Sequence, residues 1–156
     1  MGDIIVDTNV LLDLLTEDPA WESRSARAIA AAADTATLVI NPIIYAEMSV
    51  GIASIELLDD FLGVDYRRDP IPWEAAYLAG KAFLTYRRRG GRKAQPLPDF
   101  FIGAHAAVRG MRLLTRDAAR FSSYFPTVRV IEPYVCARTE THTRAAVTHS
   151  RINLGA

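Results

Sequence analysis

Short runs of branched apolar residues alternate with longer amphipathic segments along most of the chain. Branched side chains pack well on a pleated sheet, so these runs predict strands buried on both faces. They occupy residues 4–6, 37–40, 112–115 and 128–131, and a more charged run at 64–67 predicts a short edge strand. Because predicted helices separate the strands, the pattern indicates an α/β fold with a mostly parallel five-stranded sheet and helices on both faces.

Helical spacing and end signals place the helices between these strands. Asn41 and Pro42 predict a strong helix start, because asparagine accepts hydrogen bonds from free amides and proline is tolerated in the first turn. The predicted helices occupy residues 8–15, 21–33, 42–52, 55–62, 73–86 and 99–108, with a short helix or turn at 118–124.

The pattern changes after Pro133 and divides the chain into two parts. Residues 1–133 predict one domain with a single core, whereas residues 134–156 predict a tail that packs loosely or not at all. The single cysteine, Cys136, excludes an internal disulfide and fits a reducing compartment. The chain has neither an apolar run of membrane-spanning length nor the layout of a signal peptide, so we expect a cytoplasmic protein without a membrane partner.

Eighteen basic and eighteen acidic residues cancel, so the net charge neither indicates nor excludes a nucleic-acid partner. Any contact with a polyanion must therefore come from a local patch. The basic, glycine-rich stretch at 87–93 is compatible with a grip on an RNA backbone, or with a solvated helix end where basic residues suit the helix dipole. The candidate RNA-contacting residues are Arg87, Arg88, Arg89, Arg92, Lys93 and, after a predicted strand, Arg116.

Four acidic residues lie where the ends of predicted elements meet. Asp7 and Asp117 directly follow buried strands. Glu47 lies in the helix after the second strand, and Asp99 opens the helix before the fourth. In a doubly wound sheet these positions share the carboxyl edge, near the switch in strand order, where ligands bind.

Such a cluster requires a counter-charge. Two carboxylates about 4 Å apart repel by roughly 4 kcal/mol at an effective dielectric constant of 20. Oxygen-only ligands favour Mg²⁺ or Mn²⁺ over zinc. These ions bind phosphate oxygens and activate water, so hydrolysis of a phosphodiester is the expected chemistry.

Each acid also has a simpler structural explanation. Asp7 and Asp99 suit the caps of the helices that follow them, and Asp117 suits a turn with Arg116. Glu47 falls at the flank of an apolar helix face. It is the joint placement of the four at one edge that favours a functional site.

Four short motifs resemble, in order, those of PIN-domain ribonucleases, most closely the VapC-type toxins of bacterial toxin–antitoxin pairs. They are VDTNV at 6–10, YAE at 45–47, PDFFIGAHA at 98–106 and LLTRD at 113–117. The resemblance covers residues 3–132. It implies a PIN-like three-layer α/β/α nuclease domain, an endoribonuclease activity that depends on Mg²⁺ or Mn²⁺, a homodimer, and a small antitoxin partner that blocks the site.

The resemblance also implies individual roles. Asp7 and Asp99 correspond to direct metal ligands, and Glu47 and Asp117 would complete the site or hold waters. Two polar residues, Asn9 and Thr115, match positions that steady the acids in the family.

Other classes of protein fit less well. A phosphatase of the haloacid-dehalogenase type needs a second aspartate two residues after the first, where Asn9 stands. A receiver-type phosphoacceptor needs a lysine near the last strand, and none is found there. A non-catalytic RNA-binding or protein-interaction module on the same fold is the alternative, disfavoured because unpaired buried charge is costly to retain.

Some conspicuous residues are expected to have packing roles. His105 shares a helix with apolar neighbours and is predicted to be a packed or surface histidine, not a catalytic base. Trp21, Trp73 and Tyr77 are predicted to pack helices together, with a dimer interface as a further possibility.

Overall fold

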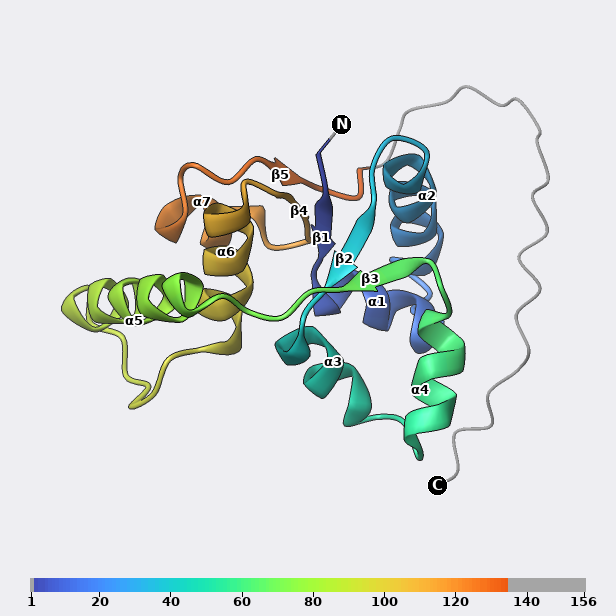
Figure 1. The fold of residues 1–156 in the computed structure, drawn as a ribbon, viewed down its shortest axis with the longest axis horizontal. Coiled ribbons are helices and arrows are strands. Elements are labelled where there is room, and N and C mark those ends of the chain that lie inside the picture. The colour runs from blue at the N-terminus through green and yellow to red at the C-terminus, as the bar shows by residue number, and fades with distance from the viewer. Residues whose placement is uncertain (1, 135–156) are drawn as a thin grey trace.

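The computed structural model describes residues 2–134, which form a single sheet with helices on both sides (Figure 1). Of the predicted tail at 134–156, only Tyr134 is described. The rest of the tail, including Cys136, lies outside the described residues. The strands are β1 (Ile4–Val6), β2 (Leu38–Ile40), β3 (Tyr66–Arg68), β4 (Arg112–Leu114) and β5 (Val130–Ile131). The helices are α1 (Thr8–Leu15), α2 (Glu22–Ala33), α3 (Pro42–Ser49), α4 (Ile55–Leu62), α5 (Trp73–Arg88), α6 (Pro98–Arg109) and α7 (Ala118–Tyr124).

The strand order is β3-β2-β1-β4-β5, and every described pairing is parallel. The predicted α/β class and the five-stranded sheet are therefore confirmed. From β1 the chain first moves outward to β2 and β3, and then returns to the other side of β1 to form β4 and β5. The order thus reverses between β1 and β4, which makes the carboxyl ends of these two strands the switch point.

The helices form two layers around the sheet. Figure 1 shows α5, α6 and α7 on one side and α1, α2 and α4 on the other, with α3 below the sheet where the strands end. The central strand β1 has no exposed side-chain surface, as its unbroken run of Ile4, Ile5 and Val6 predicts. Among the described residues, no helix combines the length and the apolar character that crossing a membrane would require.

Most predicted element boundaries agree with the structure to within three residues. The edge strand lies at 66–68 instead of 64–67, the last strand is limited to 130–131, and α3 ends at Ser49. The largest consequence concerns the basic loop, because Arg87 and Arg88 belong to the last turn of α5 and not to a loop. Arginine is a good helix former and its charge suits a helix carboxyl end, so the helix continues until the turn at Gly90.

His105 is fully buried and joins α6 to the ends of β2 and β3, so the expectation of a packed histidine is confirmed. Asn41 caps α3 by accepting hydrogen bonds through Oδ1 from the backbone N–H groups of Ile43 and Ile44, both at 3.0 Å. Its amide nitrogen therefore faces His105 Nδ1, at 3.3 Å, as a donor. The His105 proton must then reside on Nε2, which donates to Asp69 Oδ2 at 3.0 Å. Burial lowers the pKa of His105, which favours this neutral form.

Candidate active site

Asp7 leaves the end of β1 and caps α1. Its Oδ1 accepts a hydrogen bond from the backbone N–H of Thr8 at 2.8 Å, and its Oδ2 accepts one from the Thr115 hydroxyl at 2.7 Å. The residue is only 4% exposed. The simple capping interpretation is therefore correct for one oxygen, while the other oxygen belongs to a polar network between the ends of β1 and β4.

Glu47 reaches the same place from the second turn of α3. Its Oε2 accepts a hydrogen bond of 2.5 Å from the Thr8 hydroxyl, which links the start of α1 to α3. Partial burial raises the pKa of Glu47, the hydrogen bond from Thr8 lowers it, and the negative charge of Asp99 raises it again. Thr8 is a site residue that sequence reasoning missed, although it lies inside the first motif.

Asp99 is the second residue of α6, and its side chain does not cap that helix. The capping interpretation is wrong here because Leu97 occupies the cap position. The Asp99 carboxylate is partly exposed and accepts a hydrogen bond from Arg120. Its charge raises the pKa of both Asp7 and Glu47, so these three carboxylates form one electrostatically coupled group.

Asp117 caps α7, accepting a hydrogen bond from the backbone N–H of Arg120 at 3.3 Å. Its other oxygen lies 3.5 Å from Arg120 Nε. Arg120 therefore stands between Asp117 and Asp99. Sequence reasoning missed Arg120; its spacing of three residues from Asp117 was visible, but its contact with Asp99 was not.

Thr115 and Asn9 brace this arrangement. The Thr115 hydroxyl donates to Asp7 and accepts from Asn9 Nδ2 at 3.2 Å and from the backbone N–H of Asp117 at 3.0 Å. Asn9 Oδ1 in turn accepts from the backbone N–H of Arg116 at 3.3 Å. With one donor and two acceptor positions occupied, Thr115 is fully satisfied and holds one Asp7 oxygen in place.

The electrostatics of the site favour a cation. Burial is the main cause that raises the pKa of Asp7 to about 6, and Asp99 and Glu47 raise it further against the hydrogen bonds from Thr115 and Thr8. A divalent ion would relieve this excess of negative charge, and the oxygen-only donor set suits Mg²⁺ or Mn²⁺. Within residues 2–134, however, no three acidic, histidine or cysteine side chains converge closely enough to form a finished metal cage. Asp99 and Glu47 instead have their hydrogen-bond partners Arg120 and Thr8.

The predicted RNA-contacting residues at 87–93 differ in their contacts. Arg87 Nη1 donates to the backbone carbonyl of Lys93 at 2.9 Å. Arg89 Nη1 donates to Ser123 Oγ at 2.8 Å and its guanidinium lies over the Tyr124 ring. All the basic side chains of this stretch are exposed, and those of Arg88, Arg92 and Lys93 are the ones without an ion pair or side-chain hydrogen bond to residues 2–134.

Arg116 has a structural contact that the sequence did not reveal. Its guanidinium lies 3.3 Å from the buried carboxylate of Asp13 and stacks over the Trp21 ring at 4.8 Å. The other Asp13 oxygen accepts a 2.6 Å hydrogen bond from Ser25 Oγ. The Arg116 side chain thus ties the loop after β4 to α1 and α2, with less freedom to contact RNA.

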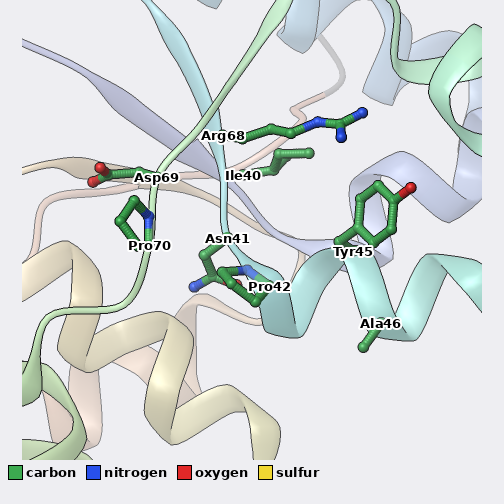
Figure 2. Close-up of a pocket in the computed structure, with 8 residues that line it drawn as sticks. All are labelled: Ile40, Asn41, Pro42, Tyr45, Ala46, Arg68, Asp69 and Pro70. Atoms are coloured by element: carbon green, nitrogen blue, oxygen red, sulfur yellow. The ribbon is translucent and has the colours of Figure 1, made fainter.

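A cavity of about 420 Å³ lies on the β3 side of α3 (Figure 2). It is lined by the ends of β2 and β3 and the first turns of α3, through Ile40, Asn41, Pro42, Tyr45, Ala46, Arg68, Asp69 and Pro70. Arg68 lies over the Tyr45 ring at 5.0 Å and pairs with Asp59. None of the four acids lines this cavity, so it is distinct from the candidate metal site.

A parallel sheet that reverses its strand order beside a group of carboxylates defines a doubly wound α/β protein with a site at its switch point. The chain belongs to the PIN domain family, whose model matches residues 4–124. That span contains all four acids and every described helix, so the family resemblance of the sequence is confirmed.

Solved structures share this fold. VapBC2 from Rickettsia felis, bound to a DNA fragment from its promoter, is 17% identical with a TM-score of 0.64, covering 83% of this chain and 97% of that chain. DNA-bound VapBC from Salmonella typhimurium is 18% identical with a TM-score of 0.64, and the match covers 86% of this chain and 100% of that chain. A toxin–antitoxin complex from Klebsiella pneumoniae is 22% identical with a TM-score of 0.63, and the match covers 85% of this chain and 98% of that chain. Comparison with curated protein sequences gave no match.

Proposed function

We propose that this protein is an endoribonuclease that depends on Mg²⁺ or Mn²⁺ and acts as the toxin of a toxin–antitoxin pair. The observation that carries the proposal is that the carboxylates of Asp7 and Glu47 both accept hydrogen bonds from Thr8, while the negative charge of Asp99 raises the pKa of both. PIN domains are generally nucleases, which supports hydrolysis of a phosphodiester as the reaction.

In this proposal Asp7 and Asp99 ligate the ion, and Glu47 and Asp117 complete the site or hold its waters. When bound, the ion supplies charge stabilisation at the phosphate and lowers the pKa of the attacking water. Asp7 must be ionised to serve as a ligand, so its raised pKa makes protons compete with the metal below about pH 6. Thr115 keeps the Asp7 carboxylate oriented through its hydrogen bond.

RNA binding would use the exposed basic side chains at the end of α5 and in the loop before α6. Arg88, Arg92 and Lys93 are exposed and precede Asp99 by 6 to 11 residues along the chain. Contacts from such side chains to phosphates supply affinity without sequence preference.

The proposed partners are an antitoxin protein and a second copy of this chain. The solved structures with the same fold include VapBC complexes and a toxin–antitoxin complex, which supports an antitoxin partner. A homodimer is proposed from the family resemblance and from the exposed aromatic residues of α5.

The test is RNA cleavage by the purified protein in Mg²⁺ or Mn²⁺, with and without a chelator. We expect Asp7→Asn and Asp99→Asn to reduce the cleavage rate by on the order of 100-fold or more, because each removes a charged ligand. Asp60→Asn, on the exposed face of α4, is the matched control and should retain wild-type cleavage.

Cleavage that survives chelation or either substitution would contradict a metal-dependent nuclease. RNA binding without any cleavage, measured by electrophoretic mobility shift, would instead support a non-catalytic RNA-binding module on the same fold.

A further inference from the structure

Arg120 joins two of the four acids. Its Nη1 donates to Asp99 Oδ2, and its Nε lies 3.5 Å from Asp117 Oδ2. Asp99 opens α6 and Asp117 caps α7, so the guanidinium links the starts of two helices. These two carboxylates have different roles in the proposed metal site: Asp99 is a direct ligand, and Asp117 completes the site or holds a water.

The position of Arg120 is set by the backbone as well as by charge. Its own N–H donates to Asp117 Oδ1, so Asp117 holds both the main chain and the side chain of the same residue. Phe121, the next residue, is buried in the core and anchors the first turn of α7. Arginine retains its charge at every relevant pH, and its rigid fork of donors is suited to contact two carboxylates at once.

Arg120 leaves part of the acidic group available. Among residues 2–134, Asp99 Oδ1 accepts no side-chain hydrogen bond, because the Arg120 contact uses Oδ2. Asp7 is held by Thr115 and by the Thr8 backbone, and no cationic side chain of residues 2–134 pairs with it. In the part of the chain that the structure describes, a cationic side chain therefore lies between Asp99 and Asp117, and none lies between Asp7 and Asp99.

We propose that Arg120 is a resident counter-ion that takes the place of a second divalent ion between Asp99 and Asp117, so that this chain binds one metal ion per site. The inference rests on the proposed metal centre and specifies its stoichiometry. Two-metal sites clamp both the attacking and the leaving oxygens with ions a few ångströms apart. Here the guanidinium supplies the positive charge on one side.

The experiment measures Mn²⁺ binding by the purified full chain in the absence of RNA. Isothermal titration calorimetry gives the number of bound ions, and electron paramagnetic resonance shows whether two ions lie close together. The wild type is expected to bind one ion. Arg120→Gln is expected to bind two, with the spectrum of a spin-coupled Mn²⁺ pair, because it frees both carboxylates. The double variant Arg120→Gln with Asp117→Asn should return to one ion, since it removes the outer ligand of the second position.

Arg112→Gln is the charge-matched control. This residue lies at the opposite, amino end of β4, where it donates to the Gly2 carbonyl, so its loss should leave a single ion. Thermal melting of each variant checks the fold, which Arg120→Gln is expected to retain because the side chain is 45% exposed.

Two bound ions in the wild type, or one ion in Arg120→Gln, would overturn the inference and leave the proposed nuclease intact. Absence of any Mn²⁺ binding would overturn both. Single-ion binding by the wild type and two-ion binding by Arg120→Gln, in a protein that cleaves no RNA, would support the inference and contradict the proposed function.

Discussion

At the scale of single residues, Asp7 combines a structural role and a proposed chemical role in one carboxylate. One oxygen caps α1 and the other accepts a hydrogen bond from Thr115, and both contacts favour the charged form. Burial and the neighbouring carboxylates outweigh them and raise the pKa to about 6. Asp99 and Glu47 contribute to this shift beside the larger effect of burial, which is consistent with the cation site that we propose.

The raised pKa of Asp7 predicts how the free energy of unfolding of the metal-free protein depends on pH. Because the folded-state pKa lies above the ordinary value of 3.8, the contribution of Asp7 to stability is greatest below that value and is lost as the pH rises through about 6. Asp7→Asn should therefore raise the free energy of unfolding by about 1–2 kcal/mol at pH 8 and by clearly less at pH 4.

Urea denaturation of metal-free protein at the two pH values measures this difference. Added Mn²⁺ should reverse the order at pH 8, because it stabilises the wild type and not the variant. A variant that is less stable than the wild type at pH 8 without metal would contradict the prediction.

At the scale of elements, the site depends on how closely α6 approaches α7. A Cβ atom on Gly103 would lie 2.3 Å from the Phe125 ring, so only glycine permits this contact. Phe100 and Tyr124 add an edge-to-face ring contact at 5.0 Å between the same two helices. This packing positions Asp99 on α6 opposite Arg120 on α7.

Gly103→Ala is accordingly predicted to destabilise the protein by about 1–3 kcal/mol, because the added methyl group forces Phe125 to move. Gly80→Ala is the matched control within a helix. A Cβ atom at Gly80 of α5 meets nothing within 4 Å, so this change should be neutral or stabilising by up to about 1 kcal/mol. Thermal or urea unfolding of the two variants measures both effects, and equal stability of both would show that the close approach is unimportant.

At the scale of the whole molecule, α5 presents three large exposed apolar side chains. Trp73 is 89% exposed and Tyr77 is 69% exposed, and Leu84 continues the same helix face. Trp73 and Tyr77 were expected to pack helices, with a dimer interface as the alternative. Packing within this chain is wrong for both, because their side chains are exposed, and the dimer interface stays a prediction. Single exposed apolar residues are common, but a stripe that includes two large aromatic residues is typical of an interaction surface.

We predict that this stripe forms the interface of a homodimer, and that Trp73→Glu converts the dimer to a monomer because it buries a charge at that interface. Val64→Glu is the control, since Val64 is 99% exposed but precedes β3. Analytical ultracentrifugation measures the mass of each variant. A monomeric wild type, or a Trp73→Glu variant that stays dimeric, would contradict the prediction.

The sequence by itself determined the order of elements, the α/β class and the polar residues that end the central strands. These features are encoded locally, because strand runs, helical spacing and caps such as Asn41 depend on neighbours within a few positions. The sequence also predicted that Asp7, after a buried strand, and Asp99, at the start of a helix, would lie at a common edge of the sheet.

Only the tertiary structure decided which charged groups pair with one another. Arg120 contacts Asp99 across 21 positions of the chain, and Arg116, in the loop after β4, contacts Asp13 of α1. Such partners depend on the distance and rotation of packed helices, which a close contact such as that at Gly103 controls. No local pattern contains that information, so the acids were foreseeable from the sequence while the cation that stands between two of them was not.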